Sequence, residues 1–215
     1  MQLLAINDAN SVDSDFTRAL IEHCSDFQIQ FTAAALHTLS KYYNLVKLWN
    51  PRLHLVAPCS PIEFAKRHVL ESLLLVHHVP PGATVSDIGS GAGFPIIPCL
   101  IVRPDVRAVL IESSKKKAIF LDEALRETGN RMAARVISER FENIATPQSQ
   151  FVTCRAIERF EEKLPQLINW SPKRTTLLFF GGPGLRTRVE STGLPFTVIP
   201  IPGSDRRLLL KIKRS

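Results

Sequence analysis

The sequence predicts an α/β protein in which a helical N-terminal segment precedes a mostly parallel sheet. The first 80 residues carry helical periodicity, and from residue 83 short β-like runs alternate with helical ones. Two further β-like runs separated by a turn close the chain. Alternation of this kind is typical of a parallel sheet that helices cover on both faces. We therefore expect a helical segment over 1–80, packed on the core, and a sheet-containing domain over 81–215.

Three helices are predicted in the first 80 residues. One spans 15–28, with Phe16, Leu20 and Phe27 facing inward. The second is an amphipathic helix over 31–49, which Pro51 ends. Its inward face recurs at steps of three and four, through Phe31, Ala35, Leu39, Tyr42, Val46 and Trp49. The third starts at Ser60-Pro61-Ile62-Glu63, which combines a capping Ser, a Pro at the first helical position and a Glu three residues after the cap, and it runs toward His77.

The rest of the chain supplies the sheet. Five predicted strands cover Thr84–Ile88, Ala108–Glu112, Arg135–Ser138, Phe151–Cys154 and Thr176–Phe180. Helices are predicted between them near 93–102, 114–128 and 157–169. Phe196–Ile201 and Arg207–Ile212, separated by Pro-Gly-Ser-Asp, predict an antiparallel hairpin added to the sheet.

Composition excludes several classes of protein. With 215 residues, 45% hydrophobic and 22% charged, the chain is neither disordered, nor collagen-like, nor a coiled coil. Its opening residues lack the basic and apolar regions of a secretory signal, and its charge-free stretches contain Pro and Gly, so we expect a cytoplasmic protein outside the membrane. The four cysteines match no C-x2-C metal pattern, so we expect reduced thiols and no metal.

Charge is unevenly distributed along the chain. Residues 1–30 hold five acidic side chains, Asp8 and Asp13 among them, against Arg18, so the remaining 185 residues carry 26 basic and 15 acidic side chains. This basic body of the chain, residues 31–215, favours a polyanionic partner, because Lys and Arg near phosphates release condensed counterions. Net charge also serves solubility and loose association, so this observation alone leaves both interpretations open.

A glycine-rich loop follows the first predicted strand. Asp87-Ile88-Gly89-Ser90-Gly91-Ala92-Gly93-Phe94 carries three alternating glycines between a strand and a helix. Open α/β sheets bind ligands at the carboxyl ends of their strands, and glycine lets the backbone approach a cofactor closely. A purely structural turn is the alternative.

Spacing distinguishes the cofactors that such a loop binds. A dinucleotide site requires G-x-G-x-x-G, and Phe94 occupies the position of its last glycine. The G-x-G-x-G spacing of Gly89, Gly91 and Gly93 instead resembles motif I of class I S-adenosylmethionine (SAM) methyltransferases. Glu112 lies 19 residues beyond Gly93, at the end of the second strand, where a carboxylate accepts both hydroxyls of an unphosphorylated ribose. The alternative for Glu112 is a solvated acid at a strand end.

Several motifs in one order resemble the bacterial RsmG family, also called glucose-inhibited division protein B. They are YNLVKLWNPRLHLVAP, KRHVLESL, DIGSGAGFP, LIESSKKKAIFLDE, ISERFENI and FVTCRAIERFEE, and the resemblance covers about residues 38–182. It implies a Rossmann-like class I methyltransferase that uses SAM to methylate N7 of a guanine in 16S ribosomal RNA. The implied partner is that RNA or the small ribosomal subunit, and we expect a monomer.

The resemblance also implies site residues. Gly89 and Phe94 match family positions at the cofactor loop, Phe141 and Glu142 match the segment beside the adenine, and Arg155 matches an arginine at the site. Methylation of N7 needs no general base, because N7 presents a lone pair and positioning dominates the catalysis. We therefore assign no catalytic acid or base.

Basic residues are the candidates for RNA contact. Arg67 and His68 lie in a family motif, and Arg186 and Arg188 follow the fifth strand. Further candidates are Lys115, Lys116 and Lys117 and the tail residues Arg206, Arg207, Lys211, Lys213 and Arg214. Solvated helix faces or salt bridges are the alternatives. Tyr42 and Trp49 could stack on a base, but their helical spacing favours core packing.

The chain departs from the family pattern in three places. It reads Phe94-Pro95-Ile96-Ile97-Pro98 where F-P-G-I-P is usual, Gly181-Gly182 where a K-G pair is usual, and His54-Leu55-Val56 where N-L-T is usual. The missing lysine keeps open a non-catalytic RNA-binding protein on a methyltransferase scaffold. Two further enzyme classes stay open, a small-molecule methyltransferase and an NAD-linked oxidoreductase, and Phe94 argues against the oxidoreductase.

Overall fold

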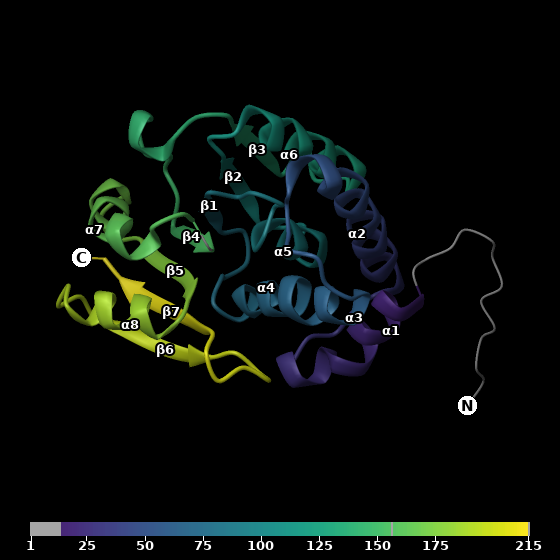
Figure 1. Cartoon of the computed structure of the whole chain (residues 1–215). Coiled ribbons are helices and arrows are strands. Elements are labelled where there is room, and N and C mark those ends of the chain that lie inside the picture. The colour runs from purple at the N-terminus through teal and green to yellow at the C-terminus, as the bar shows by residue number, and fades with distance from the viewer. Residues whose placement is uncertain (1–13, 156, 215) are drawn as a thin grey trace.

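A seven-stranded sheet forms the centre of the molecule (Figure 1). The computed structural model describes residues 14–155 and 157–214. The strand order is β3-β2-β1-β4-β5-β7-β6. Neighbouring strands are parallel from β3 to β5, and β7 runs antiparallel to both β5 and β6. The strands are β1 (Thr84–Ile88), β2 (Arg107–Ile111), β3 (Ala134–Ile137), β4 (Phe151–Arg155), β5 (Thr176–Gly181), β6 (Phe196–Pro200) and β7 (Leu208–Lys213).

The chain reverses its strand order between β1 and β4, which lie side by side although two strands separate them in sequence. Reversal points of this kind leave a crevice at the carboxyl ends of the strands, where open α/β sheets bind ligands. The α/β class, the parallel strands and the antiparallel C-terminal hairpin predicted from the sequence are confirmed.

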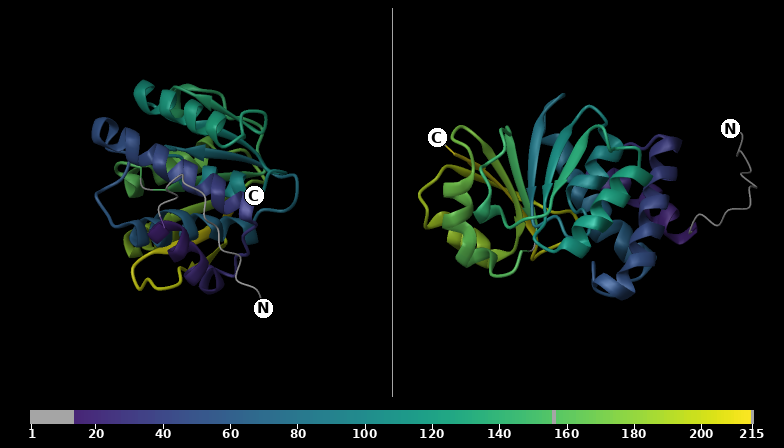
Figure 2. Two further views of the ribbon diagram at one scale, coloured as in Figure 1. Left: turned by 90° about the vertical axis from the view of Figure 1, so that its right-hand side faces the viewer. Right: turned by 90° about the horizontal axis from the view of Figure 1, so that it is seen from above.

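Helices cover both faces of the sheet (Figure 2). The alternation of side chains along each strand separates the two cores. Leu178 and Phe180 of β5 pack with the N-terminal helices, whereas Leu177 and Phe179 of the same strand pack with the C-terminal ones. The N-terminal side holds α1 (Ser14–His23), η1 (Cys24–Phe27), α2 (Ala33–Leu53), α5 (Ile96–Val102), α6 (Lys115–Glu127) and the helical run from residue 61 to 77. The other side holds α7 (Phe160–Trp170) and α8 (Pro183–Glu190).

The run from 61 to 77 is one helical path with changing hydrogen-bond spacing. It passes through α3 (Pro61–Glu63), the π-helical η2 (Phe64–Leu70), α4 (Glu71–Leu73) and the 3₁₀ turn η3 (Leu74–His77). Its predicted start is confirmed, because the Glu63 backbone N–H donates to Ser60 Oγ at 3.1 Å. π-helical segments are often found at functional sites.

Most predicted elements lie within a few residues of their observed bounds. The first predicted helix divides into α1 and η1, and Phe16, Leu20 and Phe27 are buried as expected. The prediction that Pro51 ends the second helix is wrong: α2 continues to Leu53, and His54 with a left-handed φ of 49° caps it. A proline in the last turn removes one backbone donor, and the remaining bond from His54 N–H to Asn50 C=O closes the helix. Helix α8 had no sequence prediction.

The helical segment and the sheet share one core. Buried residues from α1, α2 and η2 join those of β1, β2 and α5 in a single hydrophobic cluster. Tyr42 is fully buried there, and Trp49 packs against the cluster with its ring edge-on to Phe120, at 6.0 Å between ring centroids, so the expected core packing of both is confirmed. The division at residue 80 stays a prediction.

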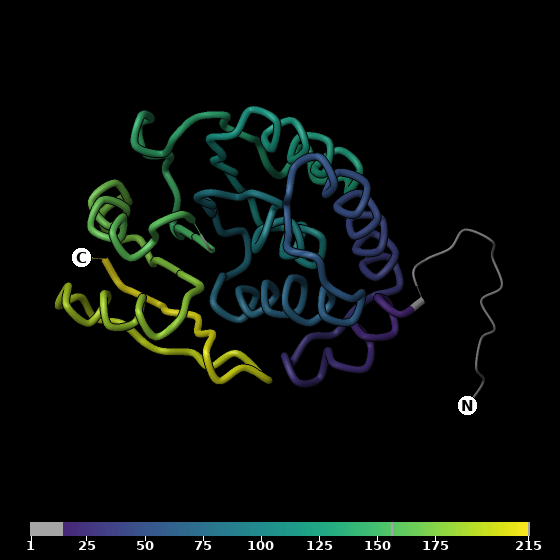
Figure 3. Tube along the Cα trace, viewed as in Figure 1, coloured from purple at the N-terminus to yellow at the C-terminus, as the bar shows by residue number. Residues whose placement is uncertain are grey.

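The tip of the C-terminal hairpin, between β6 and β7, lies beside η1 (Figure 3). All four cysteines are free thiols, with Cys99 and Cys154 buried. Among the described residues, no helix combines the length and apolar character needed to cross a membrane, and no group of three potential metal ligands forms. The expected acids Asp8 and Asp13 lie outside the described residues.

Candidate active site

A cavity of about 720 Å³ lies at the carboxyl ends of the parallel strands. Its lining includes the glycine loop after β1, the end of β2, the segment after β3 and the segment after β4. The loop after α2 closes one side with Leu55, Val56 and Ala57. Strands from four places in the sequence thus bring one set of side chains to a single crevice.

The glycine loop adopts a backbone that other residues rarely take. Gly89, Gly91 and Gly93 have φ of +67°, +53° and +91°. A β-carbon on Gly89 would lie 2.3 Å from Ile157 Cγ2, and one on Gly93 would lie 2.4 Å from Ile97 Cδ1. A β-carbon on Gly91 would meet only Gly89 O, at 3.7 Å. Gly91 therefore keeps space at the cavity surface free, whereas Gly89 and Gly93 permit close packing of neighbouring segments.

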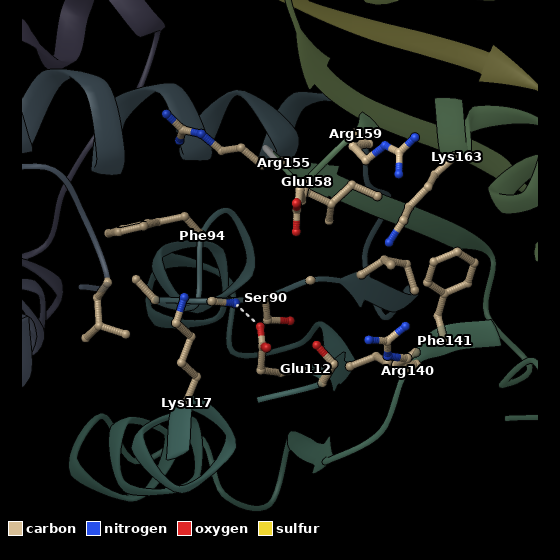
Figure 4. Close-up of a pocket in the computed structure, with 18 of the residues that line it drawn as sticks. Ser90, Phe94, Glu112, Lys117, Arg140, Phe141, Arg155, Glu158, Arg159 and Lys163 are labelled. Atoms are coloured by element: carbon tan, nitrogen blue, oxygen red, sulfur yellow. Dashed lines mark hydrogen bonds between the residues drawn. The ribbon is translucent and has the colours of Figure 1, made fainter. Parts of the chain in front are cut away.

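Glu112 holds this loop through its carboxylate. Glu112 Oε2 accepts a hydrogen bond from Gly91 N–H at 2.9 Å, and Oε1 accepts one from Ser114 N–H at 2.8 Å. Figure 4 shows the bond to the loop with the carboxylate facing the cavity. Each carboxylate oxygen has a second lone pair, so the group can still accept two hydroxyl donors. The alternative of a freely solvated strand-end acid does not fit a residue that is 7% exposed.

Asp87, just before the loop, is buried without exposure. Its Oδ1 accepts from Thr153 Oγ1 at 2.7 Å, and its Oδ2 has no hydrogen-bond partner among the described residues. Burial raises the pKa of this carboxyl to about 7, and the hydrogen bond from Thr153 opposes the rise. The group therefore titrates near neutrality.

Aromatic side chains tie the loop to the helical segment. Phe94 stacks on His68 with ring centroids 5.1 Å apart and meets the Tyr42 ring edge-on at 5.6 Å. The Tyr42 hydroxyl donates to Ala92 C=O in the loop. Burial, with the positive charge of Arg155, Arg67 and Arg207, lowers the pKa of His68 to about 3. His68 is thus a neutral imidazole in the cavity wall.

Opposite the glycine loop lies the segment after β3. Phe141, in η4 (Phe141–Asn143), is buried with its ring edge-on to Trp170 at 5.7 Å. Glu142 lies next to it, with Oε1 3.7 Å from Lys163 Nζ. Both line the cavity.

Arg155 turns away from the centre of the cavity (Figure 4). Its Nη2 donates to Arg67 C=O at 2.6 Å and to Glu71 Oε2 at 3.2 Å, and its Nη1 donates to Ser72 Oγ at 3.3 Å. Glu71 Oε1 also accepts from Arg207 Nε and Nη2, at 2.9 and 2.7 Å. Burial lowers the pKa of Arg155, and the charge of Glu71 opposes that effect. One buried carboxylate thus joins two arginines from distant parts of the chain.

Most of the predicted site residues meet at this cavity. Those that line it are Gly89, Gly91, Phe94, Glu112, Phe141, Glu142, Arg155 and His68. Gly93, also in the loop, faces Ile97 and Tyr42 instead of the cavity, and Arg67 lines a second cavity. Arg186 and Arg188 lie outside both cavities. On α8, Arg186 pairs with Glu190 at 2.9 Å, and Arg188 Nε donates to Glu161 C=O at 3.4 Å.

Sequence reasoning missed several charged lining residues. Lys117 and Lys163 point into the cavity from opposite sides, and the Glu112 and Glu158 carboxylates lie between them (Figure 4). Lys117 belongs to the lysine run considered for RNA contact, whereas Lys115 and Lys116 are exposed and outside the cavity. Helical periodicity separates the third lysine from the first two, and it could have identified Lys117.

Gly181, where the family pattern has a lysine, packs closely against a side chain of α8. A β-carbon on Gly181 would lie 2.4 Å from Leu185 Cδ2. Leu185 of α8 therefore fills the space beside the strand end.

Comparison with known proteins gives one consistent result. The family model of rRNA small subunit methyltransferase G matches residues 35–192. A ribosomal RNA small subunit methyltransferase G of Neisseria meningitidis serogroup B is 33% identical over 200 residues, which cover 86% of this chain and 93% of the relative. One of Xanthomonas axonopodis pv. citri is 40% identical over 129 residues, 59% of each chain. The first curated relatives are matched over about half to three-fifths of their length.

Solved structures resemble the fold. A SAM-dependent methyltransferase from Aquifex aeolicus has a TM-score of 0.56 and 17% identity, over 81% of this chain and 98% of that chain. An RNA methyltransferase from Salinibacter ruber, in complex with S-adenosyl-L-homocysteine, has a TM-score of 0.53 and 15% identity, over 74% of this chain and 94% of that chain. At these identities the likeness concerns the fold.

Proposed function

Because the chain belongs to the rRNA small subunit methyltransferase G family, we propose that it transfers a methyl group from SAM to N7 of a guanine in 16S ribosomal RNA. One observation carries the proposal: Glu112 binds the backbone of Gly91 at the mouth of a cavity that the family-matched segments line. The proposed substrate is this RNA, free or within the small ribosomal subunit. We further propose that the protein acts as a monomer in the cytoplasm.

The residues of the cavity fit SAM. Gly91 leaves its surface open, and Glu112 has lone pairs for the two ribose hydroxyls. Phe141 would offer an apolar surface to the adenine of SAM, and Glu142 is its neighbour in the cavity wall. Gly89 and Gly93 shape the loop through their positive φ, and Phe94 fixes its far end against His68. SAM carries a methyl group on a sulfonium sulfur, and its leaving group is a neutral thioether.

Positioning accounts for the proposed catalysis. Guanine N7 has an in-plane lone pair, so no residue has to remove a proton before methyl transfer. The chain would contribute by excluding water, by orienting the base and by balancing the positive charge that the methylated base acquires. Glu158, in the segment after β4, places a carboxylate in the cavity that suits the last of these tasks. His68, whose lowered pKa keeps it neutral near neutral pH, adds no opposing positive charge.

The direct test is transfer of tritiated methyl from SAM to small ribosomal subunits isolated from cells that lack the family's methylation. Cleavage mapping of N7-methylguanine then locates the label. We expect label at a single guanine of 16S RNA. Absence of label with intact SAM binding would assign a different acceptor, and absence of both would favour the non-catalytic RNA-binding scaffold. Label despite Gly181 would establish that the usual lysine is dispensable here.

Two competing enzyme classes have separate tests. An NAD-linked oxidoreductase requires NAD binding, and we expect none, because Phe94 replaces the third glycine of the dinucleotide motif. A small-molecule methyltransferase would modify no RNA. The basic body of the chain supports a polyanionic substrate instead.

A further inference from the structure

A second cavity, of about 300 Å³, lies between the helical run that starts at Pro61 and the tip of the C-terminal hairpin. Its walls come from distant parts of the sequence: Lys66 and Arg67 from η2, Pro202 and Gly203 from the hairpin tip, and Arg207 from the residue before β7. Pro202 and Gly203 are uncharged. The charge of this cavity therefore comes from the charged residues of its other walls.

Its carboxylates are already engaged. Glu63 Oε1 lies 2.6 Å from Arg67 Nη1, and Glu71 Oε1 accepts two hydrogen bonds from Arg207. Among residues 14–155 and 157–214, no ion pair or hydrogen bond engages the ammonium group of Lys66. Three cations therefore face two carboxylates, and Lys66 is the cation without a protein partner in the described chain.

The two cavities share one charged wall. Arg155 lines the large cavity, and its guanidinium reaches Glu71 Oε2 at 3.2 Å and the Arg67 carbonyl at 2.6 Å. Arg67 and Glu71 both line the second cavity. A group bound in the second cavity would thus lie directly behind the wall of the large cavity.

The positive charges of this wall also act on His68. His68, which lies in the wall of the large cavity, has its pKa lowered by burial and then by the charges of Arg155, Arg67 and Arg207. Arg155 and Arg207 donate hydrogen bonds to Glu71, and Arg155 also donates one to the carbonyl of Arg67. An anion in the second cavity would be attracted by these positive charges and by Lys66 together.

We propose that the second cavity binds a backbone phosphate of the substrate RNA next to the methylated nucleotide, with Lys66 as its principal cation. The proposal rests on the proposed function, because it assigns a subsite to the same RNA. A phosphate oxygen accepts from an ammonium group and from the guanidinium N–H groups of Arg67 and Arg207 that Glu63 and Glu71 leave unused. RNA phosphates of this kind fix the register of a strand without reading its sequence.

The test compares Lys66→Gln with Lys41→Gln, which removes the same charge from an exposed position of α2 outside both cavities. The probe is unmodified small-subunit rRNA, and its affinity is measured at several salt concentrations. We expect Lys66→Gln to weaken RNA binding by about tenfold at low salt and to reduce the slope of log K against log salt by about 0.7 to 0.9. Lys41→Gln should change neither value, and Lys66→Arg should restore the slope.

Two further readouts keep the interpretation clear. SAM affinity and the melting temperature should be unchanged in Lys66→Gln, and for methyl transfer KM for RNA should rise while kcat stays constant. An unchanged salt slope in Lys66→Gln, or an equal loss in Lys41→Gln, would overturn the phosphate site. Absence of methyl transfer by the wild-type protein, together with a lower slope in Lys66→Gln, would instead reject the proposed function and leave the anion site standing.

Discussion

At the scale of single residues, the bond between Glu112 and the Gly91 backbone joins the ends of β1 and β2. Two features favour glycine at position 91: the backbone is left-handed there, and the α-carbon borders the cavity. Gly89 and Gly93 also have positive φ, but their missing side chains make room for Ile157 and Ile97. Three equally spaced glycines therefore serve different purposes.

We predict that Gly91→Ala weakens SAM binding by about tenfold, because the added methyl group occupies cavity space at a cost of about 1–3 kcal/mol. Isothermal titration with SAM measures the effect. Gly129→Ala is the matched control, since Gly129 also has a positive φ, +72°, and a β-carbon there meets nothing within 4 Å. Both variants should lose about 1 kcal/mol of stability from left-handed strain. Equal SAM affinity in both would remove Gly91 from the cofactor site.

A second residue-scale prediction concerns Asp87, whose pKa rises from 3.8 to about 7 through burial. The folded state keeps a proton that the unfolded state releases between about pH 4 and 7, so this group's stabilising contribution is lost as pH rises through that range. The shift corresponds to about 4 kcal/mol. We expect Asp87→Asn, compared with the wild type, to gain stability progressively between pH 5 and pH 8 in urea unfolding experiments.

Asp105→Asn provides the control for this pH dependence. Hydrogen bonding from Arg103 lowers the pKa of Asp105, so its carboxylate is ionised in both states throughout that range. Its stability difference from the wild type should therefore not vary between pH 5 and 8. A constant difference for Asp87→Asn as well would show that Asp87 is ionised in the folded protein.

At the scale of elements, helix α2 closes the back of the site. The Tyr42 hydroxyl reaches Ala92 in the glycine loop from a position 50 residues earlier in the sequence. A β-carbon on Gly93 would lie 3.0 Å from the same hydroxyl. The helical segment thus supports the cofactor loop directly as well as covering the sheet.

We predict that Tyr42→Phe destabilises the protein by about 1–3 kcal/mol, because it leaves a buried carbonyl without its donor. It should also weaken SAM binding severalfold, since the loop loses its anchor. Thermal unfolding and SAM titration measure the two effects. Thr38→Val removes another α2 hydroxyl, whose one hydrogen bond within the described part of the chain is to Ala34 in the same helix, and it should leave SAM affinity unchanged. An unchanged SAM affinity in Tyr42→Phe would mean that α2 does not support the loop.

At the scale of the whole molecule, the formal charge of +7 is the property that relates most directly to a nucleic acid. Part of the basic charge forms ion pairs with carboxylates of the same chain: Arg155 and Arg207 pair with the buried Glu71, and Arg186 pairs with Glu190 on the surface. Arginines paired in this way contribute less to RNA binding than a count of residues suggests.

We predict that affinity for small-subunit rRNA falls steeply with added salt, with log K linear in log salt, because each phosphate contact releases counterions. Filter binding between about 50 and 200 mM salt, a range over which such contacts lose much of their affinity, measures the slope. Arg186→Gln should change this slope little, since Arg186 already pairs with Glu190. An affinity of the wild-type protein that does not change with salt would contradict the prediction that its basic body contacts RNA.

The amino-acid sequence predicts the alternation of strands and helices, the helix start at Ser60, the glycine loop and the carboxylate at the end of the second strand. These features depend on periodicity, on capping and on the φ that glycine allows, which are local properties of the chain. The error at Pro51 was also local, because a proline in a last turn costs too little to end a helix that its neighbours continue.

Pairs between side chains that are far apart in the sequence form only when the chain is folded. Arg155 and Glu71 are 84 residues apart, and Arg207 and Glu71 are 136 apart, yet both arginines reach the same buried carboxylate. Lys66, Tyr42 and Lys163 acquire their surroundings in the same way, from elements that meet only when the sheet and its covering helices are packed. Such contacts depend on the strand order and on which elements pack against one another, and no local pattern in the sequence specifies either.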